Sequence, residues 1–177
     1  HYQESLQLIT SIEKTRKQNA LAPQNAGESE QVAVIEPAGE GRIESLRKLY
    51  LADSDREALT LHINSLLNAY EYLEGRIKNR NTSPRLEFQV SVQKPSQLSV
   101  VRKQVNPANG GQSAISSTSL DAFGVNPYVS YRCSKASDQC VIKHPVTGAD
   151  WIVIARDESA AKELSQALTR LIKALQR

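Results

Sequence analysis

The chain has 177 residues, of which 40% are hydrophobic and 23% are charged. This length and apolar share suit one globular domain with a preamble, and they exclude a disordered tail. Because 22 basic residues nearly balance 19 acidic ones, the net charge of +3 does not indicate a nucleic-acid-binding protein.

The N-terminal region, residues 1–41, is predicted to be an amphipathic helix followed by a linker. Four apolar residues between Leu6 and Ile12 recur near helical spacing among charged side chains. Residues 21–41 shift to Pro, Gly, Ala, Gln and Glu, which is typical of a linker, and the apolar run Val32–Ile35 can add one short strand. Residues 42–177 are predicted to form a single α+β domain.

Two helices are predicted at the start of that domain. Ile43, Leu46 and Tyr50 indicate a short helix that ends near Ala52. The sequence Ser54-Asp-Arg-Glu57 then has the form of a capping box, in which the serine hydroxyl and the glutamate carboxylate satisfy backbone donors of the first turn. A second helix is therefore expected to begin at Asp55.

The second helix carries an apolar seam. Apolar residues follow one another at alternating steps of four and three as far as Ile77, so we expect one long helix from Asp55 to Lys78. Covering the sheet as part of the core is the simpler use of this seam. Its apolar arc is wide, however, so contact with another protein or a second copy of the chain is also expected. The candidate interface comprises Leu59, Ile63, Leu66, Leu67, Tyr70, Leu73 and Ile77.

The second half of the chain changes to strand periodicity. Leu86–Val92 alternates apolar and polar residues, and Leu98–Val105 is expected to form the next strand. The polar and glycine-containing stretch Asn106–Ser119 is predicted to be a long loop. Three further strands are predicted at Tyr128–Cys133, Cys140–His144 and Trp151–Ala155.

These segments predict a four- or five-stranded, mostly antiparallel sheet, ended by a packed helix. The strand Trp151–Ala155 has no polar alternation, so we expect it at the centre of the sheet with both faces covered. Asp157 can cap a helix whose apolar seam runs from Leu164 to Leu175. The fold class expected from the sequence is therefore α+β, with N-terminal helices ahead of the sheet.

The two cysteines, Cys133 and Cys140, are expected to form a disulfide across a hairpin. They flank a polar loop, and closing the eight residues 133–140 is worth about 2.5 kcal/mol in the chain-entropy model. Reduced thiols in a cytosolic protein remain the alternative. A disulfide favours a periplasmic or otherwise extracytoplasmic location, and the opening without Met agrees with a membrane anchor upstream of His1.

A cluster of cations follows the seam helix. Arg76, Lys78, Arg80 and Arg85 lie within ten residues, and Arg102 and Lys103 can join them across neighbouring strands. Such a basic patch can meet an acidic partner or lipid headgroups. The ordinary preference of cations for a helix C-terminus is the simpler interpretation.

No motif specifies a reaction. The three histidines are widely separated, and Cys140 with His144 would supply only two ligands, so neither a metal nor another cofactor is expected. A Gly-x-Ser-x-Gly elbow, a phosphate-binding loop and a His-Glu-x-x-His motif are all missing from the sequence. We expect no catalytic residues, although an enzyme of unspecified class stays a minor alternative.

The end of the chain resembles one family of folds. In Cys140–Arg177, an apolar strand followed by Arg156-Asp-Glu-Ser and an amphipathic helix is similar to the ending of pleckstrin-homology-like folds. That resemblance implies a cytosolic adaptor that binds peptide or acidic lipid. The leading expectation is different: a non-catalytic periplasmic domain of a membrane-anchored bacterial envelope protein, which binds other proteins in an assembly or as a sensor.

Overall fold

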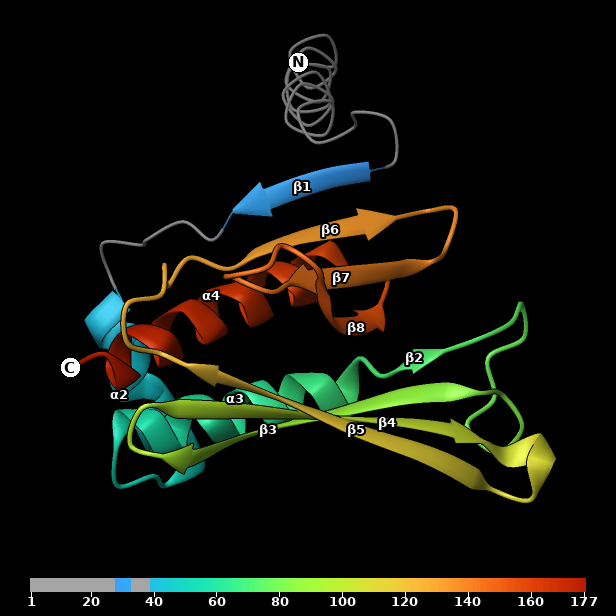
Figure 1. Ribbon diagram of the computed structural model, residues 1–177, viewed down its shortest axis with the longest axis horizontal. Coiled ribbons are helices and arrows are strands. Elements are labelled where there is room, and N and C mark those ends of the chain that lie inside the picture. The colour runs from blue at the N-terminus through green and yellow to red at the C-terminus, as the bar shows by residue number, and fades with distance from the viewer. Residues whose placement is uncertain (1–27, 33–38) are drawn as a thin grey trace, which may run out of the picture.

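The computed structural model describes residues 28–32 and 39–177. Within these residues the α+β prediction is confirmed: three α-helices accompany two antiparallel sheets (Figure 1). The helices are α2 (Gly39–Tyr50), α3 (Asp55–Ala69) and α4 (Glu158–Leu175). The helix predicted near Leu6–Ile12 lies outside the described residues.

The first sheet has the strand order β1-β6-β7-β8 and the second has the order β2-β3-β4-β5. The strands of the first sheet are β1 (Glu28–Val32), β6 (Ser130–Ser134), β7 (Gln139–Lys143) and β8 (Asp150–Ala155). Those of the second are β2 (Tyr72–Leu73), β3 (Arg85–Lys94), β4 (Gln97–Asn106) and β5 (Gln112–Asp121). A short 3-10 helix, η1 (Pro107–Asn109), joins β4 to β5.

Two helix caps form as the sequence indicates. The Ser54 hydroxyl accepts a hydrogen bond from the Glu57 N–H, and the Glu57 carboxylate accepts one from Asp53, one residue earlier than the standard capping box. Asp157 likewise accepts from the Ala160 N–H at the start of α4. Local side-chain chemistry therefore fixes where α3 and α4 begin.

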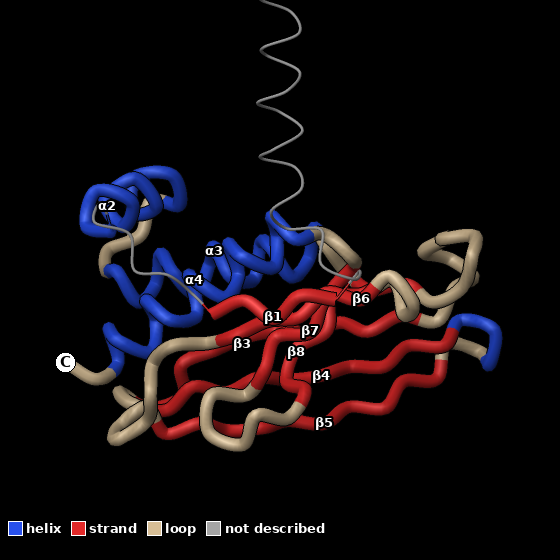
Figure 2. The backbone as a smooth tube through the Cα atoms, turned by 90° about the horizontal axis from the view of Figure 1, so that it is seen from above, coloured by secondary structure: helices blue, strands red, loops and turns tan. Residues whose placement is uncertain are grey.

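The core lies where α3 and α4 pack against each other and against the sheets (Figure 2). The predicted seam of α4 is confirmed, because Leu164, Leu168 and Leu171 are fully buried. From α3, Leu59 and Ile63 are also fully buried in this cluster. These two helices supply the apolar cover that the strands need.

The predicted single helix from Asp55 to Lys78 is wrong, because α3 ends at Ala69. After the helix, Glu71 pairs with Ile154, and β2 pairs with the beginning of β3. Gly75 then turns the chain with a φ of +97°, a conformation that glycine adopts without strain. The apolar residues keep helical spacing as far as Ile77, but after Ala69 the chain pairs with distant strands and is not helical.

The predicted loop Asn106–Ser119 is also wrong, since most of it is strand β5. β4 and β5 pair over ten consecutive positions, from Gln97 opposite Asp121 to Asn106 opposite Gln112. Gly110 and Gly111, both at positive φ, make the turn between them. The strands expected in a single sheet lie in two, because β3 and β4 pair with β5, whereas β6, β7 and β8 form a separate ladder.

The strand predicted to be central, β8, ends its four-stranded ladder instead. Its outer edge is nevertheless covered, because Glu71 pairs with Ile154 and the Ala155 N–H donates to the Tyr70 carbonyl at 2.8 Å. Trp151 and Ile152 are buried as expected for a covered strand. This short bridge also joins the first sheet to the second.

Candidate binding edge of the second sheet

Three of the seven seam residues serve the protein's own core. Leu59, Ile63 and Leu67 are buried on α3, between α4, α2 and β3. Leu66 and Tyr70 pack partly against the same core. A surface built on these five residues is therefore mostly internal.

The other two seam residues leave the helix altogether. Leu73 is half-buried in β2, and the Ile77 side chain is 85% exposed in the following turn. Because α3 ends at Ala69, no continuous apolar stripe connects Leu59 to Ile77. The seven residues of the expected interface therefore do not lie on one continuous surface.

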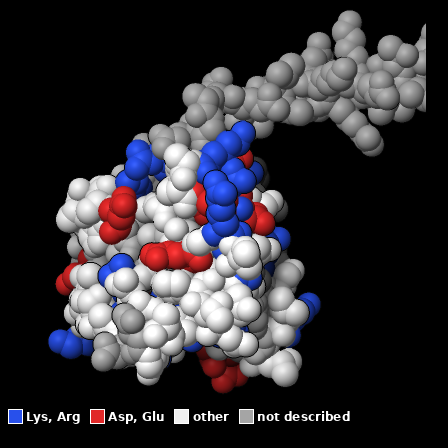
Figure 3. Space-filling model, turned by 90° about the vertical axis from the view of Figure 1, so that its right-hand side faces the viewer, with Lys and Arg blue, Asp and Glu red and all other residues white. Residues whose placement is uncertain are grey.

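The predicted basic residues are divided by ion pairs. Arg80 and Arg85 both lie beside the Glu71 carboxylate, at 3.7 and 2.9 Å, and Lys78 lies 3.5 Å from Asp138. Figure 3 shows Lys and Arg side chains directly beside Asp and Glu on this end of the molecule. The six cations therefore do not form one patch of a single sign.

Arg76 is exposed in the turn before β3 and has no ion-pair partner among the described residues. Arg102 and Lys103 also differ from the three paired cations. They are neighbours on β4, so their side chains project from opposite faces of the sheet. Within the described part of the chain, neither has an ion-pair partner. Each face of β4 thus carries one unpaired positive charge.

A groove of about 590 Å³ lies between the end of α3 and the second sheet. Its lining combines apolar, amide and charged side chains. The residues are Asn64, Leu67, Asn68, Glu71, Arg80, Glu87, Phe88, Gln89, Val101, Lys103 and Ile115. Lys103 and Ile115 are directly paired across β4 and β5, so the groove reaches the outermost strand.

Two carboxylates share one arginine in this groove. The Arg85 Nε lies 2.9 Å from an oxygen of Glu71 and 2.9 Å from an oxygen of Glu87, and its N–H is directed at Glu87. Burial raises the pKa of Glu71, and the nearby Glu87 raises it further against the opposing effects of Arg80 and Arg85. The buried Glu71 Oε1 has a charge contact with Arg85 but no hydrogen bond, because the Arg85 Nε–H is directed at Glu87 instead.

One long side of β3 is closed by a helix side chain. The Asn64 amide of α3 donates to the Val90 carbonyl and accepts from the Val90 N–H, each at 2.8 Å. At the beginning of the same edge, β2 pairs with Arg85 and Leu86. The outer edge of β3 is therefore covered at its beginning and near its middle.

The opposite margin of this sheet is open. β5 is the last strand in the order, and Figure 2 shows it along the outer margin of the strands. All seven residues from Ser113 to Ser119 are exposed, and Ile115 is 66% exposed. Ten residues of strand pair on one side only.

Sequence reasoning missed this edge because β5 lacks the alternation of a half-buried strand. Its sequence, QSAISSTSLD, is mostly small and polar, as suits an exposed strand. The dipeptide Asn109-Gly110 between two strand-length segments was the signal that could have located the hairpin.

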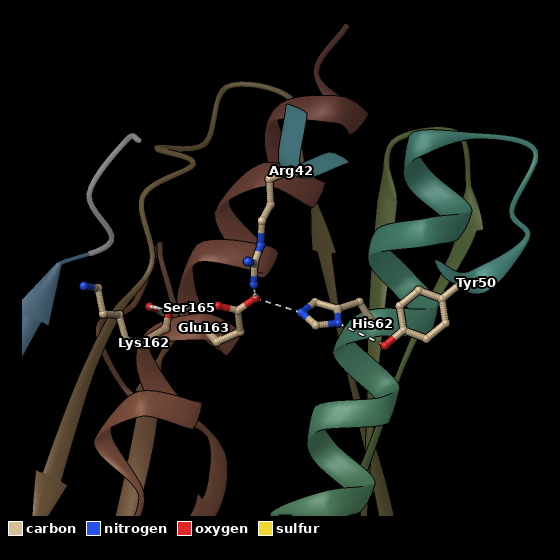
Figure 4. Close-up of polar contacts among 6 residues, drawn as sticks. All are labelled: Arg42, Tyr50, His62, Lys162, Glu163 and Ser165. Carbon is tan, nitrogen blue, oxygen red and sulfur yellow. Dashed lines mark hydrogen bonds and ion pairs between the residues drawn. The ribbon is translucent and has the colours of Figure 1, made fainter. Parts of the chain in front are cut away.

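A polar chain connects the three helices at another place (Figure 4). The Tyr50 hydroxyl bonds to His62 Nδ1 at 3.0 Å, His62 Nε2 bonds to Glu163 at 3.0 Å, and Arg42 pairs with the same carboxylate. Burial raises the pKa of Glu163, but hydrogen bonds and charges from Arg42 and His62 outweigh it and lower the pKa overall. This arrangement joins α2, α3 and α4.

Neither histidine in the described part of the chain, His62 or His144, is hydrogen-bonded to a serine. His62 bonds to Tyr50 and Glu163, and His144 Nδ1 accepts from the N–H groups of Val146 and Thr147. Burial lowers the pKa of His144, whose ring packs edge-on against Trp151. Both rings therefore have structural contacts that account for them.

The disulfide between Cys133 and Cys140 is present. The two residues are directly opposite on β6 and β7, with their Cα atoms 4.0 Å apart, and both are buried. Among the described residues, no group of three or more His, Cys, Asp or Glu side chains could hold a metal ion. Nor is any helix in the described ranges long and apolar enough to cross a membrane.

Comparison with known proteins identifies no relative. No family model, curated protein or solved structure matches the chain. The class that the structure defines is an α+β domain with a disulfide-bonded hairpin and an open edge strand.

Proposed function

We propose that this chain is a non-catalytic protein-binding domain that accepts an extended segment of another protein beside β5. The single observation that carries the proposal is the open ten-residue edge of β5. A sheet edge offers a row of unpaired N–H and C=O groups, and an added strand can satisfy them. The second sheet would then gain a fifth strand.

The composition of β5 supports this use. Proteins usually protect an exposed edge with Lys, Pro, a bulge or a covering segment. β5 contains no Lys, Arg or Pro, and its pairing with β4 runs without a register shift. The edge of β3, by contrast, is covered by β2 and Asn64.

The disulfide supports an extracytoplasmic location, and a periplasmic domain of a membrane-anchored bacterial envelope protein is the setting that we propose. Disulfides persist in oxidising compartments and are rare in the cytosol. An adaptor that binds acidic lipid is less well supported, because Lys78, Arg80 and Arg85 are already paired with carboxylates of the protein. An assembly or sensor role fits an edge that recruits a partner.

Two adjacent proline variants test the proposal. Alternate residues of an antiparallel strand direct their N–H and C=O groups inward or outward. Of Ser116→Pro and Ser117→Pro, one therefore breaks the ladder with β4, while the other removes only an outward N–H. Thermal unfolding separates the two, because only the ladder-breaking variant should be strongly destabilised.

Peptides selected from a random ten-residue phage library against the wild-type protein provide the binding probe. We expect these peptides to lose binding to the stable proline variant and to keep it in the Ser→Ala variant at the same position. Equal binding to the proline variant and the wild type, or failure to select any peptide, would contradict the proposed function.

A further inference from the structure

We infer that the segment added beside β5 is acidic, with adjacent carboxylates that project to the two faces of the sheet and meet Lys103 and Arg102. This inference rests on the proposed function and names the chemistry of the partner. Its basis is that the charges beside the open edge are positive and have no ion-pair partners among the described residues.

The charges nearest the middle of β5 are both positive. Lys103 pairs with Ile115 and Arg102 pairs with Ser116, so the two cations lie one strand inward from the open edge. From Gln112 to Leu120, β5 itself carries no charged side chain. Nothing on the strand therefore competes with a carboxylate brought by the partner.

Neighbouring carboxylates leave these two cations available. On the inner side of β4, Glu87 is opposite Lys103, but the Glu87 carboxylate is bonded to Arg85. Asp121 lies at the far end of β5, where it accepts from the Phe123 N–H. The middle of the edge thus retains a positive character on both faces.

The spacing permits contact. An added strand would lie two strand spacings from β4, which is about 10 Å between backbones. Lys or Arg and Glu side chains can together span that distance, passing the small or flexible residues of β5. Since consecutive residues of a strand point to opposite faces, two adjacent acidic residues would meet one cation each.

A second copy of this chain fits the edge less well. If two β5 strands paired about their centres, each copy would bring its own Arg102 and Lys103 to the same region. No carboxylate on either strand would neutralise them there. Charge complementarity therefore favours a different protein with an acidic extended segment.

Three fluorescein-labelled ten-residue peptides test the inference by fluorescence anisotropy. Each has the sequence Thr-Val-Thr-Val-X-X-Val-Thr-Val-Thr, with Glu, Gln or Lys at both X positions. We expect the Glu peptide to bind about two- to thirtyfold more tightly than the Gln peptide, and the Lys peptide to bind most weakly. Added salt should reduce the difference.

Two double variants assign the effect to the edge. The pair Arg102→Gln and Lys103→Gln should abolish the preference for Glu over Gln. The control pair Lys94→Gln and Lys135→Gln removes the same charge from exposed positions outside the middle of β5 and should preserve that preference.

The outcomes separate the two proposals. Equal affinity for all three peptides, lost in the stable proline variant, would overturn the inference of an acidic partner and leave strand addition at β5 intact. A Glu preference that survives Arg102→Gln with Lys103→Gln would also overturn it. If no peptide binds, or if binding is unaffected by the proline, both proposals fail. Concentration-dependent dimerisation through β5 would identify a second copy as the occupant and overturn the inference.

Discussion

Replacing Asn64 by Asp is expected to destabilise the protein by about 3 kcal/mol at neutral pH. The Asn64 amide makes two hydrogen bonds to the backbone of Val90, as donor to the carbonyl and acceptor from the N–H, each at 2.8 Å. Asp has the same shape and keeps the acceptor, but it directs a carboxylate oxygen at the carbonyl oxygen. A lost hydrogen bond costs about 1 kcal/mol, and an unsatisfied buried acceptor costs roughly 1–3 kcal/mol more.

Thermal and urea unfolding, followed by circular dichroism, measure this loss. For a chain of this size, each kcal/mol changes the unfolding midpoint by about 2–4 °C, so Asn64→Asp should lower it by about 6–12 °C. Asn68→Asp is the matched control, because Asn68 lies one turn later on the same helix, is exposed and makes no hydrogen bond within the described part of the chain. Its effect should stay within about 0.5 kcal/mol.

Acidification provides a second check on the cause. A protonated carboxyl group at position 64 can donate to the Val90 carbonyl, so the folded variant binds the proton more tightly than its unfolded chain does. The deficit of Asn64→Asp relative to the wild type should therefore shrink as the pH falls. Equal losses in Asn64→Asp and Asn68→Asp, or a deficit that does not change with pH, would refute the role assigned to this amide.

Three further predictions concern other parts of the fold. Reducing the Cys133–Cys140 disulfide should cost about 2.5 kcal/mol, seen as a lower urea midpoint with reductant than without, whereas an unchanged midpoint would mean that the cross-link does not stabilise the fold. Ser54→Ala removes the cap of α3 and should cost about 1 kcal/mol in urea unfolding; a loss near zero would show that the cap is dispensable. The lowered pKa of Glu163 means that its ion pair stabilises the fold above the unfolded glutamate value of about 4.3 and is lost as pH falls through the folded pKa. The stability difference between wild type and Glu163→Gln should therefore shrink in acid, and a pH-independent difference would contradict this assignment.

Features that depend on neighbours in sequence were predictable. The Ser54 and Asp157 caps act within one turn, and the alternation of Leu86–Val92 and the seam of α4 reflect burial on one face. The disulfide followed from two cysteines at either side of a short polar loop. Each of these signals is contained in a window of fewer than twenty residues.

Features that depend on distant pairing were not predictable. Apolar residues continue to alternate at spacings of four and three past Ala69, but Glu71 pairs with Ile154, more than eighty residues later in the chain. β5 pairs only with β4, apart from the Trp151 Nε1–H that donates to the Thr118 hydroxyl, and residues 113–119 are exposed, so no apolar pattern identified it. The candidate site was missed for a further reason: an edge is open only because no other segment pairs with it, and that is a property of the whole fold.

The edge strands of the two sheets differ in whether their outward N–H and C=O groups have hydrogen-bond partners. At β8, the peptide groups of Tyr70 and Glu71 pair with the strand, and at β3 the side chain of Asn64 takes the place of a neighbouring strand. Covering β5 in the same way would need only a polar side chain or a short segment from elsewhere in the chain. The outer side of β5 instead has no strand partner, and its residues 113–119 are exposed, with unpaired cations on either face of the adjacent strand. Stability does not require that arrangement, whereas the recruitment of an extended acidic segment would.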